Sequence, residues 1–164
     1  MTDDFGIILN SEELYLDESL STPGQIAYLG LVFCFQIGGS LFPCPGWVDS
    51  AYPVITIWAG NILRNTQSKN AKFALYFFEG SYRIDVQKSG NAVTLRAVAG
   101  HVDNDVIEHE QTGEFATLFN TVYDTICKLL RLIYIDPRFA GRAEVIARDL
   151  TYYKDKMDIY RNYL

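Results

Sequence analysis

The sequence is poor in the residues that build metal and redox sites. Its 164 residues include only three cysteines and two histidines. Cys34, Cys44 and Cys127 have no CxxC spacing, and neither HxH nor HExxH occurs around His101 and His109. Structural zinc needs four such ligands at characteristic spacing, and a disulfide framework normally has an even number of cysteines. We therefore expect no bound metal, no cofactor and no disulfide framework.

An excess of positive charge is also missing. There are 14 Lys and Arg residues against 20 Asp and Glu residues, which gives a formal net charge of −6. Binding to phosphates requires clustered basic residues, so nucleic acid is disfavoured as the direct ligand, whereas a basic protein is permitted as a partner. The N-terminus MTDDFGII has no basic region of the kind that begins a signal peptide, and we expect a cytoplasmic location.

No hydrophobic run is long enough to predict a membrane span. The nearest candidate, Ile26–Phe42, is interrupted by a glutamine and a pair of glycines and has no basic flanks. Its apolar part, Ile26–Phe35, is rich in aromatic and β-branched residues. This pattern predicts a central strand that is buried on both faces.

Catalytic motifs are absent as well. The sequence has no GxSxG, no GxGxxG and no Walker loop. Cys34 and Cys127 lie on apolar periodic faces, and Cys44 is the one cysteine expected in a loop, with no base visible beside it. We predict a protein without catalytic residues. The alternative is a small enzyme or ligand-binding protein that uses Cys44, His101 or His109 in a pocket between sheet and helices.

What the sequence does contain is typical of a globular protein, because 49% of its residues are hydrophobic and 21% are charged. Short strands are predicted at Phe5–Leu9 and Glu13–Leu16. A helix is predicted from Pro53 to about Gln67, capped by Asp49 or Ser50 and carrying Trp58 on its apolar stripe.

Three strand-like runs follow, at Lys72–Gly80, Ser81–Gly90 and Asn91–Gly100, and tight-turn sequences separate them. They predict an antiparallel meander. The first run is apolar on both faces, so we expect it in the interior of the sheet. A fourth strand is predicted at Val106–Gln111, with Glu108 and Glu110 on one face and Ile107 and His109 on the other.

Two helices are predicted in the C-terminal third, from Glu114 to Asp136-Pro137 and from about Gly141 to Tyr163. Tyrosines in the last helix, such as Tyr152 and Tyr153, fit either core packing or an interface, including one between copies in a homo-oligomer. The whole pattern predicts one α+β domain, residues 1–164, in which an antiparallel meander packs against an internal helix and two C-terminal helices.

A few residues between Gly46 and Ala99 carry a family resemblance. Trp47-Val48-Asp49 precedes a helix with Pro53-Val54, and the run Phe77–Ile84 reads Phe-Phe-Glu-Gly-Ser-Tyr-Arg-Ile. This arrangement is similar to immunity proteins of bacterial polymorphic or contact-dependent toxin systems. The resemblance implies a non-catalytic protein that binds and neutralises a cognate toxin domain.

Acidic residues outside the predicted core are the candidate partner-binding residues: Asp103, Asp105, Glu108 and Glu110. An acidic surface would steer the approach of a basic toxin and contribute to specificity. We therefore predict that these side chains contact the partner.

Overall fold

The computed structural model describes residues 5–101 and 104–164. Over these ranges the chain forms two four-stranded antiparallel sheets and three α-helices, which confirms the predicted α+β class. Sheet A contains β1 (Gly6–Glu18), β2 (Ile26–Ile37), β3 (Ser40–Phe42) and β4 (Val48–Ser50). Sheet B contains β5 (Asn70–Tyr76), β6 (Tyr82–Ser89), β7 (Ala92–His101) and β8 (Asn104–Glu114). The helices are α1 (Ala51–Asn65), α2 (Phe115–Ile135) and α3 (Glu144–Arg161), with a short 3-10 turn, η1 (Pro137–Phe139), before α3.

Strand β2 is the centre of sheet A. It pairs with β1 on one side and with β3 and β4 on the other. Leu31, Phe33 and Phe35 share one face and are fully buried, whereas on the opposite face Cys34 is buried but Val32 and Gln36 are half-buried. The predicted central position of this strand is confirmed, and the predicted burial is complete on one face only. The two strands predicted before it are one continuous strand, β1, whose pairing is irregular between Asn10 and Tyr15. Within the described residues, no helix is long and apolar enough to cross a membrane.

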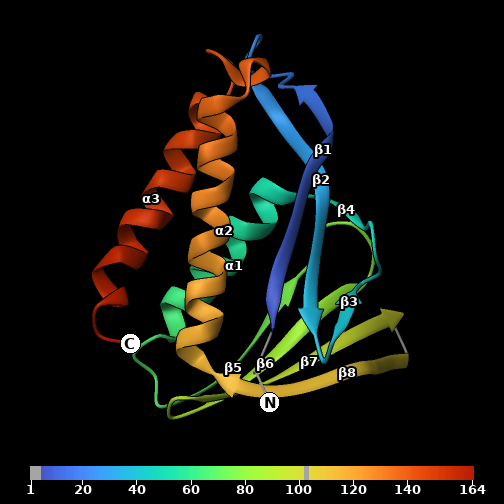
Figure 1. Cartoon of the computed structure of the whole chain (residues 1–164), viewed down its shortest axis with the longest axis vertical. Helices are drawn as coiled ribbons and strands as arrows, with labels where there is room; N and C mark the ends of the chain where they lie inside the picture. Colours follow the sequence, from blue (N-terminus) through green and yellow to red (C-terminus); the bar gives the residue numbers. More distant parts are fainter. Residues whose placement is uncertain (1–4, 102–103) are drawn as a thin grey trace.

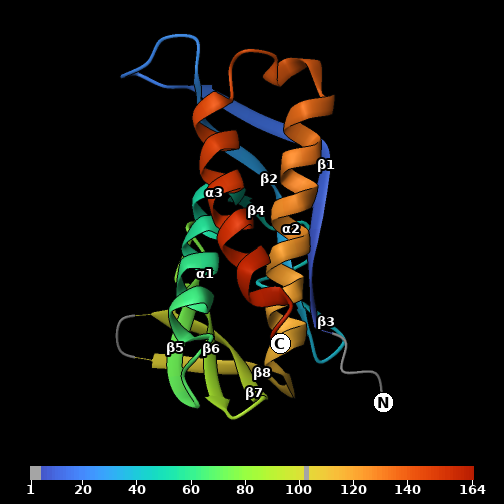
Figure 2. The ribbon, with the colours of Figure 1, turned by 90° about the vertical axis from the view of Figure 1, so that its left-hand side faces the viewer.

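Sheet B is the predicted meander, in the order β5-β6-β7-β8. Gly80 precedes β6 and Gly90 lies in the β6–β7 turn, with φ of 72° and 61°, a conformation that side chains with a Cβ rarely adopt. The sheet lies across one end of the molecule, at the ends of α1 and α2, while β1 and β2 run alongside the helices (Figure 1, Figure 2).

The first run of the meander is not in the interior of the sheet, and that prediction was wrong. β5 is an edge strand, and α1 covers its free edge. Trp58 Nε1 donates a hydrogen bond to the Tyr76 carbonyl at 2.7 Å, and Asn61 Nδ2 donates one to the Ala74 carbonyl at 2.9 Å. The run is apolar because a helix, rather than another strand, packs beside it.

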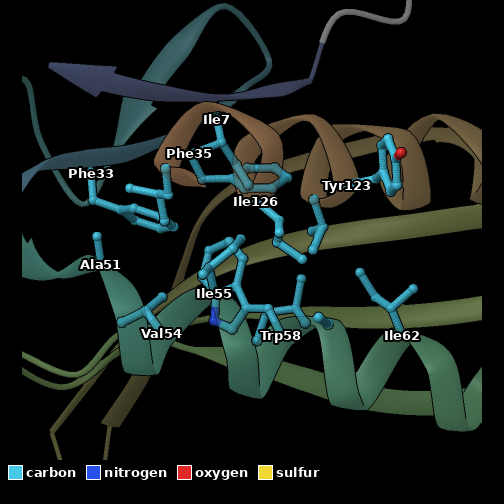
Figure 3. Packing of buried hydrophobic residues seen from close by; sticks show 14 of the residues in the cluster. Ile7, Phe33, Phe35, Ala51, Val54, Ile55, Trp58, Ile62, Tyr123 and Ile126 are labelled. Atoms are coloured by element: carbon cyan, nitrogen blue, oxygen red, sulfur yellow. The ribbon is translucent and has the colours of Figure 1, made fainter. Parts of the chain in front are cut away.

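The core lies between sheet A, sheet B and the helices, and Figure 3 shows its centre. The Trp58 side chain is 0% exposed, which confirms its predicted place in the core. Its ring packs edge-to-face against Phe33 and Phe77, each with a centroid distance of 5.3 Å. Such geometry adds about 0.5–1.5 kcal/mol per pair beyond the buried area.

Helix α3 is attached to the other two helices by tyrosine–aspartate hydrogen bonds. The Tyr52 hydroxyl of α1 donates to Asp149 at 2.5 Å, and the Tyr123 hydroxyl of α2 donates to Asp158 at 2.6 Å. Burial, together with the bond to Asp149, raises the pKa of Tyr52. Tyr153 packs against the core, so core packing accounts for part of the tyrosine pattern in this helix.

Candidate protein-binding surface

The outer face of sheet B is not covered by the helices, which pack on its inner side (Figure 1, Figure 2). The strand register places one set of side chains on this outer face, called the open face below. Its main members are Lys72, Tyr76, Arg83, Asp85, Gln87, Thr94, Arg96, Asp105, Ile107 and Glu110. Val98 belongs to the same set by register but is only 1% exposed. Two neighbouring hollows of about 280 and 420 Å³ indent it, and Tyr76 lines both.

Ion pairs across strands order the charges of the open face. The Arg83 guanidinium binds Asp85 at 2.8 Å on its own strand and reaches over β7 to bind Asp105 of β8 at 2.6 Å. The hydrogen bonds from Arg83 lower the pKa of the Asp105 carboxyl. Arg96 binds Glu110, its direct cross-strand neighbour. The face therefore presents fixed charges of both signs.

The structure places the predicted acidic residues in different settings. Asp105 and Glu110 lie on the open face, each in an ion pair, and Glu108 is exposed. Asp103 lies outside the described residues. Glu108 is the extra residue of a β-bulge, because Ala97 pairs with His109 while Val98 pairs with Ile107. The predicted alternation along β8 was wrong for this reason, and contact of these acids with a partner stays a prediction.

A buried carboxylate fixes the loop next to the open face. Asp49 is 0% exposed, and its oxygens accept hydrogen bonds from the backbone N–H groups of Ser50 at 2.7 Å, Phe78 at 3.1 Å and Glu79 at 3.2 Å. The Trp47 indole N–H donates a further bond at 3.1 Å. Several donors of this kind stabilise a buried carboxylate. Asp49 was a candidate cap for α1, but Ser50 is the N-cap and makes no side-chain cap bond.

The residues that carry the family resemblance lie together at this loop. The Trp47 and Tyr82 rings pack edge-to-face with a centroid distance of 5.0 Å. Gly80 lies against both rings: a Cβ there would stand 2.8 Å from Tyr82 and 3.3 Å from Trp47. Together with Asp49 they form a packing cluster that joins sheet A to the β5–β6 loop.

Two exposed aromatic side chains next to this cluster were missed by the sequence reasoning. Tyr76, the last residue of β5, is 58% exposed, and Phe78, two residues further on, is 62% exposed. Exposed aromatic residues are typical of the centres of protein interfaces. The bond from the Phe78 N–H to Asp49 holds the loop in place, so little backbone freedom remains to be lost on binding. The sequence did contain a signal for their exposure, because Tyr76 and Phe78 alternate with Leu75 and Phe77, which are buried.

Residues named for the ligand-binding alternative lie on separate elements. Cys44 is exposed in the loop between β3 and β4, where its carbonyl accepts a hydrogen bond from the Cys34 thiol at 3.1 Å. His109 lies on β8, opposite Ala97, and His101 ends β7. Over the ranges that the structure describes, no group of three or more His, Cys, Asp or Glu residues could hold a metal ion.

Lys88 is a second buried charged group among the described residues, and its contacts are those of a structural residue. Its ammonium donates to the carbonyls of Asn65 at 3.3 Å, Thr66 at 3.0 Å and Ser68, and lies 4.5 Å from the centre of the Phe115 ring. Burial lowers the pKa of Lys88. These bonds satisfy carbonyls at the C-terminal end of α1.

Comparison with known proteins gave no match at a significant level, whether with family models, curated proteins or solved structures.

Proposed function

We propose that this chain is a non-catalytic protein of the immunity type, which acts in the bacterial cytoplasm, and that it binds and neutralises a cognate toxin domain through the open face of sheet B. The observation that carries the proposal is this hollowed face, which the helices do not cover, with the exposed Tyr76 on it, the exposed Phe78 beside it and fixed charges of both signs. It has the composition of a protein interface, which is rich in tyrosine, phenylalanine and arginine at its centre.

The shape of the surface also supports a protein as the partner. The two hollows on the open face are shallow neighbours rather than one deep pocket, and side chains from all four strands of sheet B contribute to the face. A small ligand normally buries most of its surface in a concave apolar pocket. A partner protein can instead cover the whole face, with Tyr76 and Phe78 entering its surface.

The charge of the chain favours a basic partner. The formal net charge is −6, and Glu79 and Glu108 are exposed beside the open face. Opposite net charges raise the rate of association, and this contribution weakens as salt screens it. A nuclease toxin, which must itself bind phosphates, would meet this requirement.

The test is protection of growing cells. The C-terminal domain of the large secreted protein encoded beside this chain is expressed in a sensitive host, with and without this chain. We expect growth to be restored by the native chain and by Tyr134→Ala, which removes an exposed tyrosine from α2, far from the open face. We expect Tyr76→Ala to weaken binding of the purified toxin domain by about 1–2 kcal/mol, or roughly 5–30-fold in Kd.

Two results would overturn the proposal. One is a neighbouring gene that encodes no such protein. The other is a toxin domain whose Kd responds to Tyr134→Ala and not to Tyr76→Ala, because the interface would then be on the helices.

A further inference from the structure

The two edges of sheet B differ in whether their outward backbone groups are hydrogen-bonded. Side chains of α1 occupy carbonyls of the β5 edge, as described above. On the opposite edge, β7 is the only strand that pairs with β8 among the described residues. Across the same ranges, no backbone hydrogen bond joins residues 105–110 to a loop or helix. An uncovered edge offers free N–H and C=O groups to another strand.

Natural edge strands often carry a device that prevents such pairing, such as a lysine, a proline, other charged side chains or a β-bulge that twists the edge away. The β8 sequence, NDVIEHEQTGE, contains no lysine and no proline, and its protection against another copy consists of acidic side chains and the bulge at Glu108. It also exposes two neighbouring apolar side chains, because Val106 is 56% exposed and Ile107 is 55% exposed. Adjacent residues of a strand point to opposite faces, so both faces of this part of β8 are accessible. An added strand would cover apolar surface on each face.

The charges of β8 indicate the kind of strand that fits. The strand has four acids and no Lys or Arg. Asp105 and Glu110 are paired with arginines of β6 and β7, whereas Glu108 and Glu114 make no ion pair among the described residues. Two copies of β8 side by side would bring like charges together, which destabilises cross-strand pairs. A strand with Lys or Arg at alternate positions would place opposite charges there instead. The pattern disfavours a second copy of this chain and favours a basic partner segment.

We propose that β8, between Asp105 and Glu110, binds an extended basic segment of a partner protein as an additional strand of sheet B. The bulge residue Glu108 marks the centre of the proposed binding site. The Glu108 carboxylate is exposed and makes no ion pair among the described residues. Backbone hydrogen bonds supply affinity in this mode of recognition, and alternate side chains supply specificity. The inference rests on the proposed function only in taking the partner to be a protein.

Amide hydrogen exchange of the full chain tests this without the toxin. The probe is a synthetic peptide of about seven residues, the usual strand length, Ac-Lys-Val-Lys-Val-Thr-Val-Lys-NH2. At a peptide concentration about ten times its Kd, bound amides are protected roughly elevenfold. We expect this slowing at residues 105–110 and not in β1 or β5.

Variants and control peptides make the outcome specific. We expect Glu108→Lys to weaken peptide binding roughly three- to tenfold, since a favourable cross-strand charge pair becomes an unfavourable one. Asp124→Lys, which reverses an exposed acid on α2, should leave it unchanged. A peptide with Glu in place of each Lys should not protect β8.

The proposal is overturned if the basic peptide does not slow exchange at residues 105–110 up to its solubility limit. Equal protection by the acidic peptide would also overturn it, as would protection of β8 that appears without peptide as the protein concentration rises, because a second copy would then occupy the edge. Failure of the toxin to bind, with peptide protection intact, would remove the proposed function and leave this inference standing.

Discussion

The two edge strands of sheet B, β5 and β8, belong to one meander but have different surroundings. Trp58 and Asn61 of α1 donate hydrogen bonds to carbonyls of β5, whereas β8 pairs only with β7 among the described residues. β5 carries the fully buried Leu75, while β8 exposes Val106 and Ile107. One edge is therefore part of the core, whereas the other is exposed along β8. We expect the β5 edge to contribute more to stability than the β8 edge, which we propose as the binding edge.

The largest effect is expected at Asp49, whose buried carboxylate accepts hydrogen bonds from the backbone just after β5. Asp49→Asn keeps the shape of the side chain but turns an amide N–H2 toward buried donors. We expect a loss of about 3–6 kcal/mol in the free energy of unfolding, because at least two donors lose a charged acceptor. Urea denaturation measures it. Asp124→Asn is the matched exposed control and should change stability by less than about 0.5 kcal/mol.

A pair of truncations compares the two edges directly. We expect Leu75→Ala on β5 to cost about 2–5 kcal/mol through a core cavity. Ile107→Ala on β8 should cost less than about 1 kcal/mol, since more than half of that side chain is already in water. Equal losses in urea denaturation would mean that β8 is as much a part of the core as β5.

The hydrogen bonding between α1 and the β5 edge can be weakened without changing β8. Asn61→Leu keeps a side chain of similar size and removes the donor to the Ala74 carbonyl. We expect a loss of about 1–2 kcal/mol, the usual cost of leaving a partly buried acceptor without its bond. Amide exchange should become faster along β5 and remain unchanged along β8. Faster exchange throughout the chain would show global unfolding rather than an uncovered edge.

The smallest effect concerns pH on the open face. Hydrogen bonds from Arg83 depress the pKa of Asp105 below its ordinary value. A depressed pKa contributes stability above the unfolded value, and this contribution is lost as the pH falls through the folded value. The effect is small because the carboxyl is exposed. We expect Arg83→Gln to move the Asp105 midpoint in an NMR titration up toward the ordinary value, and to leave Asp136, which Arg138 holds low, unchanged.

Periodicity was enough to predict most elements of the fold. The apolar run of β2, the turns of the meander and the helical spacing of α2 are local signals, and each is present in the structure. The position of β5 at the edge of sheet B could not be predicted from periodicity. A run that is apolar on both faces fits a central strand and a helix-covered edge equally well, and donors from α1 decide between them.

Less of the candidate site than of the fold could be predicted from the sequence. Asp105, Glu108 and Glu110 were named in advance, but their ion pairs and the bulge depend on strand register, which single-residue patterns do not fix. The role of Asp49 depends on N–H groups of Phe78 and Glu79, which are distant in sequence. Trp47, Gly80 and Tyr82 are among the residues on which the resemblance rests, but the sequence did not indicate that they pack together.

The most direct test is amide exchange of the full chain, alone and saturated with the toxin domain that we propose as its partner. The account predicts slower exchange at residues 105–110 of β8 and in the β5–β6 loop, with α3 unchanged. Slower exchange confined to α2 and α3, with β8 unchanged, would contradict it.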